Sequence, residues 1–210
     1  MTQQSRTKKP YWPSFHGKKS SLIPSSSASN TIHSVKTRSE QISEALRYIS
    51  AYPDELREQV QTLIEKEQLS QHLLERYPEP HEYNSNKLLR TYTNQIKNTY
   101  LKSSERLTKV CFDDKLHLVH HALGTQSFIS LAHGKKLKTR RELRISSLFK
   151  SCPEALLKMI VVHELAHLKE KEHNHAFYRL CVHLEPRYHQ LEFDARIYLI
   201  HRELFGSLYG

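Results

Sequence analysis

The sequence predicts an α+β protein with a helical N-terminal half, a small and mainly antiparallel sheet, and helices at the C-terminal end. Two changes of pattern support this fold class. Apolar residues recur every three or four positions between residues 40 and 101, which is typical of helices, whereas short β-type runs occupy 107–149. The helical spacing then returns from residue 154 to residue 204.

The first half is expected to contain four helices. The first has apolar residues at positions 42, 45, 46 and 49, and a second begins after Pro53. A short third helix covers 71–77 and ends before Pro78, because proline cannot continue a helix. A fourth helix covers 86–101, where apolar and tyrosine side chains share one face.

Four short strands are expected next, at 107–112, 115–120, 127–132 and 141–149. Only two residues, Asp113 and Asp114, separate the first pair, and a connection of this length suits a hairpin turn. A basic turn around Gly134 joins the second pair. These two turns are the reason for expecting a mainly antiparallel sheet.

Three helices complete the chain. Pro153 suits the first position of a helix, which we expect over 154–170 and which is the most apolar part of the sequence. Two further helices are expected at 174–184 and 190–204.

The charge is distributed unevenly along the 210 residues. The formal net charge is +10, but residues 1–39 contain seven basic residues, no acidic residue and ten serines. We expect this segment to be a disordered basic tail, because it has too few apolar residues to form a core. The other 171 residues, expected to form one domain over 40–210, hold 25 basic and 22 acidic residues. Their net charge of +3 argues against nucleic acid as the main partner.

Three features predict a cytoplasmic protein without a membrane segment. Cys111, Cys152 and Cys181 lie far apart and form no CxxC pair, so we expect free thiols in a reducing compartment. The basic N-terminus lacks the apolar region of a secretory signal. Ionisable residues interrupt the most apolar run, 155–168, so no stretch of about 18 apolar residues is present to cross a bilayer. Nothing in the sequence indicates an oligomeric state.

The strongest chemical signal is the HExxH motif at 163–167. Residues four positions apart in a helix are rotated by about 40° around the axis and lie one turn apart along it. The imidazoles of His163 and His167 can therefore reach one ion. Glu164, about 100° around the helix, can act as general base on a water molecule that the metal activates. Neutral imidazoles and an open fourth position suit Zn²⁺, one ion per chain, although imidazoles also bind other divalent transition metals.

A third ligand must come from outside the motif. His173 is the first choice, because the polar segment 170–172 allows the helix to end and the chain to turn back. Glu192 is the second choice and His175 the third. Three protein ligands leave one position open, as a hydrolase requires.

Two segments, MIVVHELAHLKEKEHNHAF at 159–177 and YHQLEFD at 188–194, resemble the YgjP-like metal-dependent hydrolases, a family with a zincin-type metallopeptidase domain. Weaker similarity extends back to about residue 41. The resemblance implies metal ligation by His163, His167 and His173 and a catalytic role for Glu164. It also implies a zincin-like α+β fold in which a small sheet packs beside the active-site helix.

Other residues are candidates for supporting roles. Tyr178 and Tyr188 are candidates to donate a hydrogen bond to a developing oxyanion, with core aromatic residues as the alternative. Asp194 is a candidate to orient a ligand histidine through a hydrogen bond, with an ordinary surface aspartate as the alternative. A basic stretch near Gly134 is either a solvated turn or a phosphate-binding site. The candidate phosphate-binding residues are Lys136, Lys138, Arg140 and Arg141.

We therefore predict a zinc-dependent hydrolase that acts on a small nucleotide or a peptide. The resemblance to a metallopeptidase domain implies that the enzyme cleaves a peptide bond. A member of the same family instead implies cleavage of the phosphoanhydride bond of a nucleoside triphosphate, in which UTP is converted to UMP and diphosphate. The chain has no Walker A loop to hold a nucleotide in the usual way. The alternative from a different class is a non-catalytic, zinc-stabilised nucleic-acid-binding module that uses the tail and the basic turn.

Overall fold

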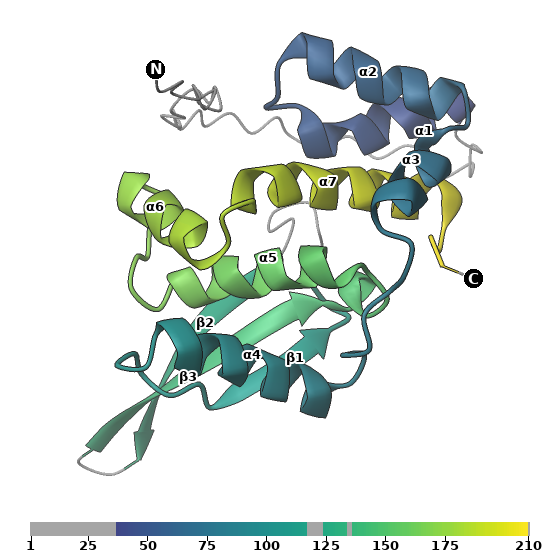
Figure 1. The fold of residues 1–210 in the computed structure, drawn as a ribbon. Helices are drawn as coiled ribbons and strands as arrows, with labels where there is room; N and C mark the ends of the chain where they lie inside the picture. The colour runs from purple at the N-terminus through teal and green to yellow at the C-terminus, as the bar shows by residue number, and fades with distance from the viewer. Residues whose placement is uncertain (1–36, 117–123, 134–135, 210) are drawn as a thin grey trace, which may run out of the picture. The chain divides into compact units, whose positions relative to one another are not determined.

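The described helices and strands follow the predicted order, with three described strands where the hydrophobic pattern predicts four. The computed structural model describes residues 37–116, 124–133 and 136–209, with side chains described over 37–116 and 141–209. In chain order the elements are α1 (Arg38–Ala45), η1 (Leu46–Ile49), α2 (Asp54–Glu65), α3 (Leu69–Arg76), α4 (Asn86–Tyr100), β1 (Lys109–Asp113), β2 (Gly124–His133), β3 (Lys136–Ser146), η2 (Ser147–Phe149), α5 (Glu154–Ala166), α6 (His175–Leu184) and α7 (Tyr188–Phe205) (Figure 1).

The first described helix begins inside the segment that the sequence assigns to the tail. The Thr37 hydroxyl accepts a hydrogen bond from the Glu40 amide at 3.3 Å, and the Glu40 carboxylate accepts one from the Thr37 amide at 2.7 Å. This reciprocal pair is a capping box, which satisfies two backbone donors and starts α1 at Arg38. Residues 1–36, the rest of the predicted tail, lie outside the described residues.

The three described strands form one mixed sheet in the order β1–β3–β2. Strand β1 runs parallel to β3, and β2 runs antiparallel to β3. The prediction of a mainly antiparallel sheet is therefore wrong, because β1 runs parallel to its neighbour β3, although β2 and β3 pair antiparallel across the basic turn as expected. Residues 117–120 of the strand predicted at 115–120 lie outside the described residues, so the hairpin predicted after β1 stays a prediction. Asp113, expected in the hairpin turn, instead pairs with Arg144 of β3 at 2.8 Å and accepts a hydrogen bond from the Lys115 amide at 2.9 Å.

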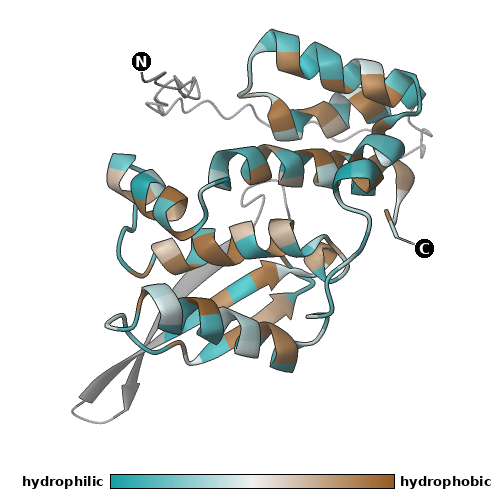
Figure 2. Cartoon of the chain, in the orientation of Figure 1, coloured by the Kyte–Doolittle hydropathy of each residue, from teal (hydrophilic) through white to brown (hydrophobic). Residues whose placement is uncertain are grey.

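Helix α5 lies between the sheet and α7 and also contacts α6 (Figure 1). Nine of its 13 residues are buried, and they occur on all sides of the helix. Figure 2 shows α5 brown or pale along most of its length, whereas α2 at the surface has a teal face. Such an apolar circumference is typical of a helix that packs on several sides. No helix in the described part of the chain combines the length and apolar composition that a membrane span needs.

The N-terminal helices cover the face of α7 that is turned away from α5 (Figure 1). Segment η1 and helices α1 and α3 all contact α7, while α4 packs against β1. The three cysteines are buried and form no disulfide, as expected. A small sheet accompanied by helices that precede and follow it confirms the α+β class.

Candidate metal centre

The C-terminal end of α5 carries two histidines, and a third comes from the chain that follows. His163 lies in the last turn, His167 is the C-cap, and His173 lies just before α6. Their ligand nitrogens lie within 4.8 Å of one another, and the Nε2 atoms of His163 and His173 are 3.0 Å apart. Nitrogens that bind one zinc ion through bonds of about 2.0–2.1 Å lie at similar distances from one another. We call these three residues the histidine triad.

The end of α5 explains how His173 reaches the other two histidines. The helix was expected to continue to residue 170 but ends at Ala166. The amides of Leu168 and Lys169 bond to carbonyls only three residues back, which tightens the last turn. Asn174 then starts α6, because its side chain accepts a hydrogen bond from the Phe177 amide at 2.9 Å. The chain therefore reverses within a few residues after His167.

The hydrogen bond made by His167 determines which of its nitrogens can bind a metal. Its Nδ1 lies 3.0 Å from the backbone carbonyl of Glu170. A carbonyl only accepts hydrogen bonds, so Nδ1 carries the proton and the neutral ring has its lone pair on Nε2. This tautomer is the one that a histidine needs to bind a metal through Nε2.

One aromatic ring lies beside all three histidines of the triad, of which His163 and His167 are partly buried and His173 is exposed. The Phe177 ring centroid lies 5.0, 4.6 and 4.7 Å from the rings of His163, His167 and His173, respectively. Burial, followed by the neighbouring histidines, lowers the pKa of His163 well below its ordinary value. Burial also lowers the pKa of His173. Neutral imidazoles, the form that binds metals, are therefore favoured.

Glu164 follows His163 on α5 and is buried. Burial raises the pKa of its carboxyl group to about 8, because a charged carboxylate is poorly solvated in the protein interior. A nearby cation favours the carboxylate and acts against this rise. The ionisation of Glu164 should therefore depend on whether a metal is bound.

Comparisons with known proteins place these residues in a family. The family described as "YgjP-like, metallopeptidase domain" matches residues 15–193. The chain belongs to the YgjP-like family. It is also 49% identical over 154 residues to a protein of Escherichia coli (strain K12) named "UTP pyrophosphatase", and the match covers 73% of this chain and 92% of that relative. No solved structure matches. These findings identify the chain as a metal-dependent hydrolase.

The other candidates for the third ligand have different positions in this YgjP-like hydrolase. The Glu192 carboxylate pairs with Arg196 at 3.0 Å. His175 is the exposed first residue of α6. Among the side chains that the structure describes, neither residue joins the histidine triad.

Asp194 does not have the contacts expected of a residue that orients a ligand histidine. Its carboxylate accepts hydrogen bonds from the Tyr77 hydroxyl at 2.6 Å and the Gln190 amide at 2.9 Å, and pairs with Arg76 at 2.9 Å. These contacts join α7 to the end of α3. We therefore correct its predicted role from supporting the metal site to holding two helices together.

We expect Asp194→Ala to lower the free energy of unfolding by about 2–3 kcal/mol, because it leaves partners of a buried carboxylate unsatisfied. Asp54→Ala is the matched control, since Asp54 pairs with Arg57 on the surface and such pairs contribute about 0–1 kcal/mol. Urea unfolding of the metal-free protein measures both. Weaker zinc binding by Asp194→Ala without loss of stability would contradict this structural role.

The two tyrosines differ in their access to a substrate. Tyr188 is fully buried, and its hydroxyl lies 2.6 Å from Nδ1 of His163, so it is poorly placed to donate to an oxyanion. Tyr178 is partly exposed, and its ring lies 6.3 Å from that of His173. Sequence reasoning missed Phe177, although its position three residues after the capping residue Asn174 places it in the first turn of α6.

The basic stretch gives only limited support for phosphate binding. Arg141 pairs with Glu105 at 2.5 Å, and Arg144 pairs with Asp113 and Glu142 at 2.8 Å each. The charge of Arg141 is therefore already paired within the protein, and its role in phosphate binding stays a prediction. The side chains of the other three candidates lie outside the described residues: Lys136, Lys138 and Arg140.

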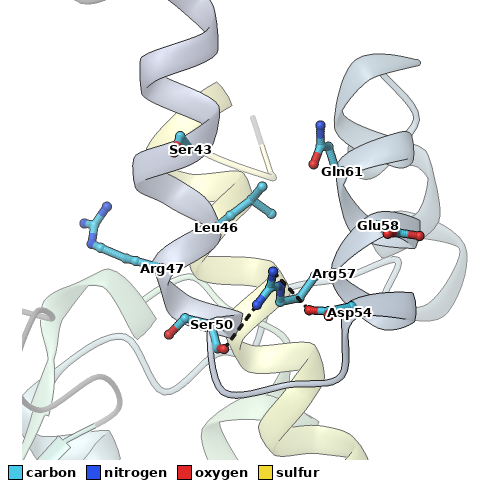
Figure 3. A pocket seen from close by; sticks show the side chains of 8 residues that line it. All are labelled: Ser43, Leu46, Arg47, Ser50, Asp54, Arg57, Glu58 and Gln61. Carbon is cyan, nitrogen blue, oxygen red and sulfur yellow. Dashed lines mark hydrogen bonds and ion pairs between the residues drawn. The ribbon is translucent and has the colours of Figure 1, made fainter.

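A surface pocket lies between α1–η1 and α2 (Figure 3). Its two cations already have partners within the protein, because Arg57 pairs with Asp54 at 3.1 Å and Arg47 pairs with Glu203 at 2.7 Å. It contains no residue of the histidine triad. The lining residues are Ser43, Leu46, Arg47, Ser50, Asp54, Arg57, Glu58 and Gln61.

Proposed function

We propose that residues 40–210 form a zincin-type domain that hydrolyses its substrate with one Zn²⁺ ion, held by His163, His167 and His173. The observation that supports this most directly is the spacing of the triad, whose ligand nitrogens lie within 4.8 Å of one another. The tautomer of His167 supports it independently, because its Nε2 lone pair is available to a metal. Three neutral imidazoles also match the ligands that Zn²⁺ prefers.

The bound Zn²⁺ would supply Lewis acidity, which polarises the scissile bond and lowers the pKa of water to about 7. Glu164 then acts as the general base, since it accepts a proton from the attacking water at a carboxylate oxygen and passes it to the leaving group. Its burial favours this task, because a carboxylate held away from bulk water is a stronger base. Tyr178 is the candidate donor to the developing negative charge.

The substrate that we propose is a nucleoside triphosphate, with UTP hydrolysed to UMP and diphosphate. The support comes from the relative named UTP pyrophosphatase, because the match covers nearly all of that protein. The second candidate is a peptide bond, which the description of the family as a metallopeptidase domain favours.

A substrate panel tests this proposal. The zinc-loaded full chain is incubated with UTP, CTP, ATP and GTP and, separately, with an unstructured peptide. We expect UMP and diphosphate to form from UTP, with no cleavage of the peptide. Chromatography of the nucleotides and mass spectrometry of the peptide measure the two reactions. Peptide cleavage without nucleotide hydrolysis would replace the first candidate with the second, and Glu164→Gln controls for contaminating enzymes.

A further inference from the structure

The side of His163 that is turned away from the triad faces a buried tyrosine. The Tyr188 hydroxyl lies 2.6 Å from Nδ1 of His163, and the two rings are nearly parallel, with an angle of 17° between their planes. The other ring nitrogen, Nε2, lies 3.0 Å from Nε2 of His173. The two nitrogens of His163 are thus divided between the tyrosine and the triad.

This division has a chemical consequence for the proton on the ring. A neutral histidine that binds a metal through Nε2 keeps its proton on Nδ1, and that proton needs an acceptor in a buried site. The Tyr188 hydroxyl oxygen can accept it. Burial raises the pKa of the Cys181 thiol to about 12 and Tyr188 acts against this rise, so the Cys181 sulfur is close enough to accept the proton of the hydroxyl.

We propose that Tyr188 is a positioning residue that holds His163 in the tautomer and orientation required for metal binding through Nε2. This inference rests on the proposed zinc site and deepens it. His167 receives the equivalent support from the backbone carbonyl of Glu170. His163 is supported by the Tyr188 side chain and not by the backbone, so a substitution of Tyr188 can remove this support.

The test compares Tyr188→Phe with Tyr198→Phe. Both tyrosines lie on α7 and are fully buried, and the Tyr198 hydroxyl donates to the Leu148 carbonyl at 3.3 Å, so each variant loses one buried hydroxyl. Zinc affinity is measured by competition with a chromophoric chelator. We expect Tyr188→Phe to weaken zinc binding about 10–100-fold, the usual effect of removing a partner of a ligand histidine, and Tyr198→Phe to leave it unchanged.

A second measurement does not depend on a variant that folds. Long-range ¹H–¹⁵N spectra of the zinc-loaded full chain report which nitrogen of His163 carries the proton. We expect a proton on Nδ1, and a proton on Nε2 would overturn the inference. Equal zinc affinity of the two phenylalanine variants would also overturn it.

The His163→Ala variant separates this inference from the proposed function. We expect it to weaken zinc binding by roughly 10²–10³-fold. If it does so while Tyr188→Phe binds zinc normally, only the positioning role fails. If His163→Ala itself binds zinc normally, the proposed metal site and the positioning role fail together.

Discussion

Glu164→Gln is expected to lower kcat for UTP hydrolysis by about 10²–10⁴-fold, the usual contribution of a general base, while zinc binding is retained. Glutamine has nearly the same shape as glutamate, but its amide cannot take a proton from water at this position. The histidine triad keeps all its ligand nitrogens in this variant. Steady-state kinetics and the zinc content of the purified protein measure the two effects.

Glu185→Gln is the matched control for this prediction. Glu185 is also buried and lies at the end of α6, but its carboxylate pairs with Lys158 of α5 at 2.7 Å. We expect this substitution to lower stability and to leave kcat near the wild-type value. Wild-type turnover by Glu164→Gln would exclude Glu164 as the general base.

Removal of any one histidine of the triad is expected to weaken zinc binding by roughly 10²–10³-fold and to abolish turnover. Structural zinc sites contribute about 10–16 kcal/mol, so one ligand of four corresponds to about 2.5–4 kcal/mol. The variants are His163→Ala, His167→Ala and His173→Ala. Competition with a chelator measures the affinity, and hydrolysis of UTP measures the turnover.

His175→Ala is the control for the His173 variant. It removes an exposed imidazole only two residues away, and His175 does not belong to the triad. We expect it to bind zinc as the wild type does. Full zinc binding by His173→Ala would instead point to the second candidate, Glu192.

The local features of this chain could be predicted from its sequence. The helices have strong apolar periodicity, and the segment that contains the triad spans only 163–173, so a motif and one turn are enough to indicate it. The end of α5 was harder to predict. The residues after Ala166 suit a helix, but the chain adopts a tight turn stabilised by the hydrogen bond between His167 and the Glu170 carbonyl.

The remaining errors concern contacts between distant parts of the chain. The direction of β1 depends on its pairing with β3, which lies about 30 residues later. Asp194 finds its partner Tyr77 at a separation of 117 residues, and no local pattern in LEFD indicates this contact. The position of Tyr188 after the HExxH motif was enough to make it a candidate site residue. Its contact with His163 could not be predicted, because it depends on how α7 packs on α5.

The central position of α5 has a consequence for laboratory evolution of this enzyme. Glu164 and the first histidine of the triad lie on a helix with nine of 13 residues buried, so substitutions there disturb the core and the chemistry together. A library that seeks new substrates should keep α5 unchanged. It should vary the partly exposed His189, whose ring lies 5.7 Å from that of Tyr178, because substitutions at such positions cost little in folding.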